Sequence, residues 1–165
     1  MGAGHLVRRF VGSLAARRLT DEEAAWVATH LLPGEAELWD RMGRADQRHA
    51  HGVARRAAAA LGDEATRPVV AAALLHDVGK VESGLGTYGR VMATLSGAVA
   101  GRDMAEAWSQ TRGMTRRIGL YLRHEEVGAD LLRLAGSDPR TVDLVARWST
   151  PTDPVAAALR TADEA

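Results

Sequence analysis

Residues 69–80 read Val69-Val-Ala-Ala-Ala-Leu-Leu-His-Asp-Val-Gly-Lys80, and this stretch is the most informative part of the chain. An unbroken apolar run is typical of a buried helix, and here it leads directly into His76 and Asp77. Burying an imidazole beside a carboxylate costs free energy unless another group satisfies both of them. A divalent metal ion would do so and would also supply a hydrolytic catalyst. The alternative is a helix end that carries His and Asp without binding a metal.

The composition predicts a single globular domain. The chain has 165 residues, of which 46% are hydrophobic and 25% are charged. The formal net charge is zero, so nothing marks the chain as a general binder of nucleic acids or anionic membranes. The absence of cysteine excludes disulfides, thiolate zinc sites and cysteine nucleophiles. Any metal ion must therefore be held by His, Asp, Glu or water.

The apolar segments predict a cytoplasmic protein that does not contact a membrane. Residues 1–14 include basic side chains and lack the apolar core of a signal peptide. The longest apolar run, 69–75, is too short to span a bilayer. A cytoplasmic location is therefore the default expectation.

Lys80 is the only lysine among the 21 lysine and arginine residues. The excess of Arg, Ala and Gly is what GC-rich coding gives, and we interpret it as a signature of the source. Against that bias, a single lysine directly after the His-Asp pair suggests a function there, although chance also accounts for one lysine.

The apolar residues recur at helical spacing, and no stretch alternates with the period of a strand. Proline, glycine and capping residues divide the chain into segments. The predicted helices span residues 20–32, 35–61, 66–79, 88–100, 104–110, 115–123, 124–135, 139–148 and 154–165, with a glycine-rich loop at 81–89. The sequence thus predicts an all-α, compact multi-helix bundle. We expect residues 1–34 to form a helical extension packed on the domain of residues 35–165.

His49 is a candidate ligand because of its place on the predicted helix 35–61. It shares one helix face with the apolar residues Leu38 and Val53. His51 lies about 200° around the same helix and is expected to face elsewhere. An isolated histidine on an apolar face is more often a hydrogen-bonded core residue, so the case for His49 depends on its companions.

Asp163 is the candidate from the last helix, where it follows the inward-facing Leu159 by four positions. On its own, such a residue is usually a solvated carboxylate at a helix end. Together, two imidazoles and two carboxylates lie on or beside the core-facing sides of three helices: His49, His76, Asp77 and Asp163. A mixed set of this kind suits Mn, Fe, Co, Ni, Zn or Mg, and the sequence does not choose among them.

Three motifs occur in order along the chain: His49-x-x-x-Val53-Ala54, Ala73-Leu-Leu-His-Asp-Val-Gly-Lys80 and Leu159-x-x-Ala162-Asp163. Together they resemble the HD-domain superfamily of metal-dependent phosphohydrolases over about residues 46–163. The resemblance implies that His49, His76, Asp77 and Asp163 are the four protein ligands of one divalent metal ion. It extends to the segment that begins at His124, a histidine that in the family often serves a second metal or contacts substrate phosphate.

The chain departs from the family in the helix before the final aspartate. Members with two metals usually carry a His-His pair there, whereas this chain reads Val145-Ala-Arg-Trp148-Ser149-Thr150. The resemblance therefore implies a single-metal hydrolase or a catalytically weakened relative, and it disfavours oxygenase-type members, which need two irons.

The resemblance implies hydrolysis of a nucleotide or another small phosphoester. Asp77 would bind the metal and orient or deprotonate water, Lys80 would neutralise phosphate oxygens, and His124 would protonate the leaving oxygen or bind phosphate. His124 is alternatively a partly buried residue at a helix start. A second function stays open, a non-catalytic HD-domain module that binds a metal or nucleotide or takes part in signalling. The absent histidine pair favours the module, and the intact ligand set with Lys80 favours the enzyme.

Overall fold

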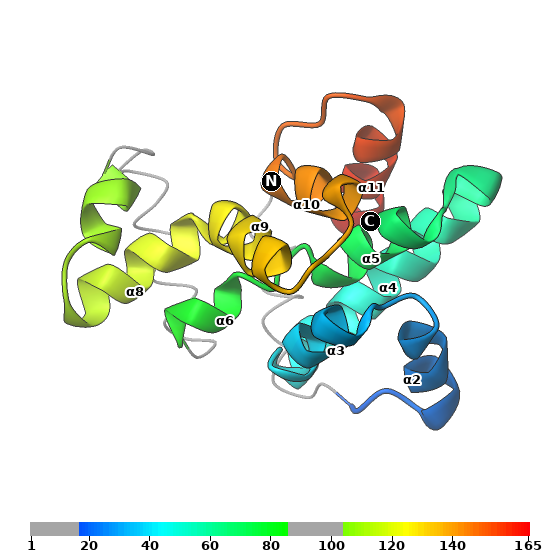
Figure 1. Ribbon diagram of the computed structural model, residues 1–165, viewed down its shortest axis with the longest axis horizontal. Coiled ribbons are helices and arrows are strands. Elements are labelled where there is room, and N and C mark those ends of the chain that lie inside the picture. The colour runs from blue at the N-terminus through cyan, green and yellow to red at the C-terminus, as the bar shows by residue number, and fades with distance from the viewer. Residues whose placement is uncertain (1–16, 86–103) are drawn as a thin grey trace.

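The computed structural model describes residues 17–85 and 104–165. Within these two ranges the chain forms helices and no strands, which confirms the predicted all-α class (Figure 1). The helices are α2 (Asp21–Ala28), α3 (Pro33–Asp40), α4 (Arg44–Leu61), the short 3₁₀ helix η1 (Gly62–Glu64), α5 (Arg67–Leu75), α6 (Lys80–Ser83), α8 (Gly113–Leu122), α9 (His124–Leu134), α10 (Pro139–Ala146) and α11 (Pro154–Glu164). A further helical stretch covers residues 104–109. The helix predicted over 88–100 lies outside the described residues.

Helix α5 is the centre of the bundle. Residues 69–75 are all buried, as expected for a helix that is apolar on every side. α4 packs on one side of α5 and α10 on another, while α11 packs on α4 and α9 packs on α10 (Figure 1). The residues that follow α5 therefore emerge in the middle of the molecule, between elements from distant parts of the chain.

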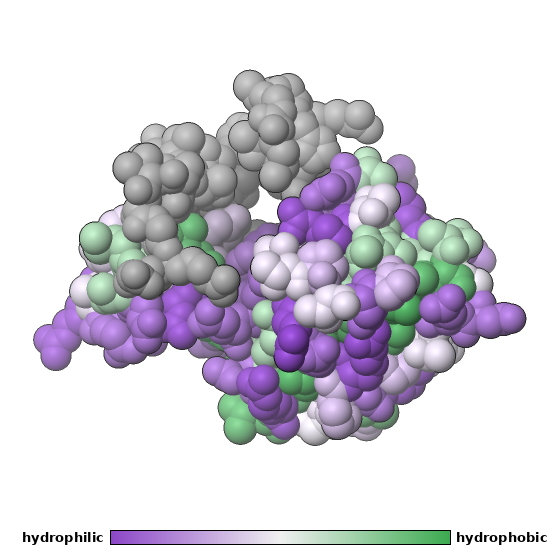
Figure 2. Space-filling view, turned by 90° about the horizontal axis from the view of Figure 1, so that it is seen from above, coloured by the Kyte–Doolittle hydropathy of each residue, from purple (hydrophilic) through white to green (hydrophobic). Residues whose placement is uncertain are grey.

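Helices α6 and α8 form a separate contact to one side of this centre, at the left of Figure 1. The face seen in Figure 2 is mostly hydrophilic, with hydrophobic residues in separate patches. Amphipathic helices that turn their apolar faces inward give such a surface. No helix among residues 17–85 and 104–165 is both long enough and apolar enough to cross a membrane.

Helix α11 is fixed at both ends. At its start, the Asp153 carboxylate accepts a hydrogen bond from the Ala156 N–H (2.9 Å) and pairs with Arg140 of α10 (2.9 Å). These two interactions lower the pKa of the Asp153 carboxyl. Near its end, Nε of Arg56 on α4 donates to the Ala162 carbonyl oxygen (2.9 Å). The last turn of α11 is thereby held against α4.

The single helix predicted over residues 35–61 is wrong, because the chain breaks between α3 and α4. Gly43 is extended (φ −65°, ψ 148°) and starts α4, and the Gln47 side chain donates to the Trp39 carbonyl oxygen at the end of α3. The apolar spacing continues across the break, so periodicity alone does not detect it. The boundary predicted between residues 34 and 35 lies inside α3, which begins at Pro33.

The helix predicted over residues 66–79 also ends earlier, at Leu75. The next residues form tighter turns, in which Val78 N–H donates to the Leu75 carbonyl and Lys80 N–H to the Asp77 carbonyl. α6 then occupies the start of the loop predicted over 81–89, and Gly84, in the left-handed conformation (φ 57°), ends it.

Candidate metal centre

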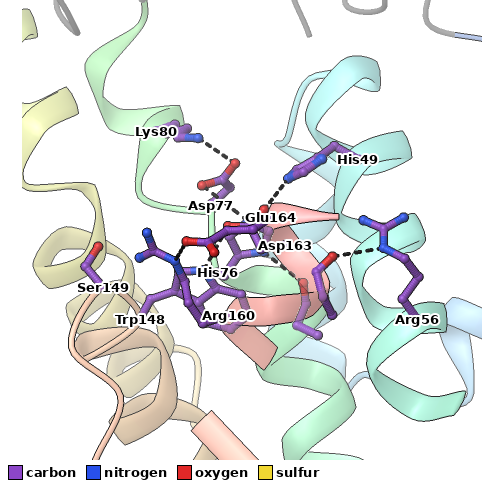
Figure 3. A network of polar contacts seen from close by, with 12 residues as sticks. His49, Arg56, His76, Asp77, Lys80, Trp148, Ser149, Arg160, Asp163 and Glu164 are labelled. Atoms are coloured by element: carbon purple, nitrogen blue, oxygen red, sulfur yellow. Dashed lines mark hydrogen bonds and ion pairs between the residues drawn. The ribbon is translucent and has the colours of Figure 1, made fainter. Parts of the chain in front are cut away.

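Three potential metal ligands converge where α5 ends (Figure 3). His49 comes from α4, and His76 and Asp77 follow the last residue of α5. One ligand atom from each lies within 4.8 Å of the others, so this group can hold a metal ion. Asp163, from the last turn of α11, lies beside them: its Oδ1 is 2.8 Å from Nε2 of His49 and 3.8 Å from Nε2 of His76.

These separations are close to those of ligands that share one ion. Atoms about 2.0–2.2 Å from a common metal, at tetrahedral or adjacent octahedral positions, are about 2.8–3.6 Å apart. The measured contacts are 2.8 Å for His49–Asp163, 3.6 Å for His76–Asp77 and 3.8 Å for His76–Asp163. These three contacts link the four residues in one cluster, and the group of His49, His76 and Asp77 has ligand atoms within 4.8 Å of one another.

Hydrogen bonds set the tautomers of two histidines. Nδ1 of His76 lies 2.9 Å from the Ala73 carbonyl oxygen, and Nδ1 of His124 lies 2.9 Å from that of Tyr121. A carbonyl oxygen only accepts, so each Nδ1 carries the proton and donates it. In the neutral ring Nε2 then presents its lone pair, and a backbone-anchored imidazole of this kind is the usual form of a metal-binding histidine.

The two carboxylates are held in their ionised forms. Burial alone would raise the pKa of Asp77, but the charge of Lys80 and the nearby rings of His76 and His124 hold that pKa well below its usual range. Burial likewise opposes ionisation of Asp163, and the hydrogen bond from His49, the nearby His76 imidazole and the Trp148 N–H outweigh it and lower its pKa. Ionised carboxylates are the protonation state that binds metals.

Lys80 and His124 approach different oxygens of the Asp77 carboxylate. Nζ of Lys80 is 2.5 Å from Oδ2 of Asp77, and Nε2 of His124 is 3.6 Å from Oδ1. Burial opposes the charge of Lys80, whose side chain is 12% exposed, but Asp77 more than compensates and raises the lysine pKa. Burial and the Lys80 charge lower the pKa of His124. A buried ammonium and a neutral imidazole therefore stand next to the candidate ligands.

Gly79 explains how His124 comes so near. A Cβ atom at residue 79 would lie 2.0 Å from the His124 carbonyl oxygen and 2.6 Å from the Gly128 nitrogen. Real Cβ atoms do not approach backbone atoms this closely, so only glycine lets the turn after α5 lie against the start of α9. Sequence reasoning treated Gly79 only as a helix end and missed this role, which depends on a contact between distant segments.

Trp148 is a second residue that sequence reasoning missed. Its side chain is buried after α10, and its indole stacks on the His76 ring, with centroids 4.4 Å apart and planes at 13°. Its Nε1–H donates to Oδ2 of Asp163 (3.1 Å). A buried tryptophan usually finds a hydrogen-bond partner for its N–H, and this rule could have indicated that Trp148 bonds to a polar group.

His51 faces away from the centre, as its position on the helix predicted. Its ring meets Trp26 of α2 edge-on, with centroids 5.5 Å apart, and its Nδ1 is 3.9 Å from Oε1 of Glu23. His51 therefore belongs to the contact between α4 and α2 rather than to the ligand cluster.

The group of His49, His76 and Asp77 thus has three neighbours. Asp163 lies beside the two histidines, and Lys80 and His124 each lie next to Asp77. All six residues singled out from the sequence gather in one place, although they come from four regions of the chain. The group's mix of imidazole and carboxylate is compatible with several divalent ions. Comparisons with known protein families, with curated proteins and with solved structures find no match for this chain.

Proposed function

We propose that this protein is a metal-dependent phosphohydrolase of the HD-domain type, acting on a nucleotide or another small phosphoester. One observation carries the proposal: the His49–Asp163 contact of 2.8 Å lies directly beside the buried His76–Asp77 pair. The order of these residues in the sequence resembles that superfamily, and the reaction class is taken from this resemblance.

The donor set fits one divalent ion. His49, His76, Asp77 and Asp163 would hold it, since three close contacts link these two imidazoles and two ionised carboxylates in one cluster. Such an ion polarises phosphoryl oxygens and makes water a nucleophile near neutral pH.

Lys80 and His124 would act on the substrate. An ammonium group has three N–H donors, so Lys80 can hold Asp77 and donate to a phosphoryl oxygen at the same time. The Nε2 atom of His124, which lies near Oδ1 of Asp77, would first take up a proton from water and would then bind phosphate or pass that proton to the leaving oxygen. Asp77 would orient the attacking water through Oδ1, the oxygen that faces the imidazoles of His76 and His124.

A non-catalytic module is the second candidate. Trp148 lies in the segment where two-metal relatives carry a histidine pair, and its indole covers one face of His76. Such a centre would bind an ion, or an ion with a nucleotide, without turnover.

The test begins with protein purified without chelator, whose metal content is analysed. A panel of nucleotides and generic phosphoesters is then assayed with the wild-type protein, Asp77→Ala and the control Asp130→Ala, which alters an exposed acid on α9. We expect bound metal and turnover in the wild type and the control, and neither in Asp77→Ala. Metal without turnover on any substrate would favour the module. Full turnover in Asp77→Ala would refute the proposed mechanism.

A further inference from the structure

We propose that Trp148 is a positioning residue for the metal centre: its indole N–H orients Asp163, and its ring fixes the plane of His76. This inference rests on the proposed function, because it assumes that these two residues are ligands. It assigns a role to a residue that the ligand motifs do not include.

The two oxygens of the Asp163 carboxylate have different partners. Oδ1 is 2.8 Å from Nε2 of His49, on the side of the ligand cluster, and Oδ2 accepts from Nε1 of Trp148 at 3.1 Å (Figure 3). The terminal torsion of an aspartate is broad, so donors are needed to fix the orientation of its carboxylate. The indole N–H holds Oδ2, and Oδ1 is left directed at the centre, where His49 contacts it.

The His76 ring is restrained from two directions. Its Nδ1–H is bonded to the Ala73 carbonyl oxygen, and its face lies on the indole, nearly parallel to it. The hydrogen bond fixes which nitrogen faces the cluster, and the stacking fixes the plane of the ring. Together they hold Nε2 towards Asp77 and Asp163.

Trp148 is itself well anchored. The residue is 6% exposed, and its backbone N–H donates to the Val145 carbonyl oxygen (3.3 Å). The next residue, Ser149, is hydrogen-bonded through its hydroxyl to Glu125 at the start of α9. The indole thus sits on a turn tied to the helix that carries His124, and one short segment links both sides of the centre.

Groups that orient metal ligands typically change metal affinity or activity 10–100-fold when they are removed. An indole that served only to fill the core would affect stability and leave the ligand field of the ion unchanged. Metal affinity and the spectrum of the bound ion therefore separate the two roles.

The experiment titrates metal-free full-length protein with Co²⁺ and records both the dissociation constant and the visible spectrum. The variant is Trp148→Phe, and the matched control is Trp39→Phe, which alters another buried tryptophan, on α3. We expect Trp148→Phe to bind Co²⁺ about 10–100-fold more weakly, with a spectrum shifted towards that of Asp163→Asn. Trp39→Phe should match the wild type. Wild-type affinity and spectrum in Trp148→Phe would overturn the inference.

A second replacement covers the case in which Trp148→Phe does not fold. Benzothienylalanine at residue 148 keeps the shape of the indole and lacks only the N–H, so it tests the bond to Asp163 directly. Weakened binding is again expected, and unchanged binding overturns the inference while the proposed function stands. A wild-type protein that binds no Co²⁺ or other divalent ion would remove the proposed function and this inference together.

Discussion

Nε2 of His49 lies 2.8 Å from Oδ1 of Asp163, although 114 positions separate the two residues in the chain. Helix α11 reaches α4 at this point because Arg56 binds the Ala162 carbonyl oxygen one residue earlier. The contact places a carboxylate from the last turn of α11 beside the His76–Asp77 pair. The ligand cluster is therefore a property of the folded chain, and its chemistry depends on interactions that hold helix ends in place.

Asp77→Ala should destabilise the protein as well as remove metal. The Lys80 ammonium, nearly buried, would lose its partner at 2.5 Å. Breaking a buried pair from one side costs about 3–5 kcal/mol of unfolding free energy, which the helical fold can survive. Urea unfolding followed by circular dichroism measures the loss. The double variant Asp77→Ala/Lys80→Met should recover part of it without recovering metal, and a single variant as stable as the wild type would contradict the pairing.

Gly79→Ala should disrupt the contact between the turn after α5 and the start of α9. The added methyl group would meet the His124 carbonyl oxygen at 2.0 Å, and backbone cannot move aside as a flexible side chain can. We expect a loss of about 1–3 kcal/mol in unfolding free energy, together with reduced turnover. Gly52→Ala is the matched control: its nearest neighbour is the flexible end of Arg56, and alanine favours the helix by up to about 1 kcal/mol. Equal stability of the two variants would show that the close approach is absent.

Glu35→Ala should loosen α3 from the bundle. The Glu35 side chain is buried, and its Oε2 accepts from the Leu32 N–H (2.8 Å) and from Arg67 at the start of α5 (3.2 Å). Losing these bonds to a charged group costs about 1.5–3 kcal/mol. Glu37→Ala, at an exposed position of the same helix, should change stability by less than about 0.5 kcal/mol. The two variants are compared by urea unfolding, and similar small effects would argue against the anchoring role.

The lowered pKa of Glu23 predicts that part of the stability of the fold is lost in acid. Hydrogen bonds from Arg48 and from the Thr20 N–H lower the pKa of Glu23 from 4.5 to about 2. Because the folded-state pKa is depressed, the carboxylate stabilises the fold above its ordinary pKa, and this contribution disappears as the pH falls from about 4.5 towards 2. The difference in melting temperature between wild type and Glu23→Gln should therefore be largest near about pH 6 and shrink over that interval. A difference that does not change with pH would contradict the assignment.

Much of this structure follows from short-range patterns. The helical spacing predicted the all-α class and the inward face of His49, and the apolar run predicted the buried end of α5. Periodicity failed at Gly43, where α3 and α4 meet, because the apolar pattern continues across a break in the backbone. The partners of Gly79 and Trp148 could not be named from the sequence, since each depends on an approach between segments far apart in the chain.

The most direct test of the central claim is a titration of metal-free protein with Mn²⁺ or Co²⁺. The stoichiometry and the dissociation constant are measured for the wild type and for single alanine variants of the four candidate ligands, which are His49, His76, Asp77 and Asp163. One ion per chain is expected in the wild type, with binding weakened at least about 10-fold in each of the four variants and unchanged in Asp130→Ala. Wild-type protein that binds no ion, or His49→Ala and Asp163→Ala variants that bind as tightly as the wild type, would contradict a shared metal centre.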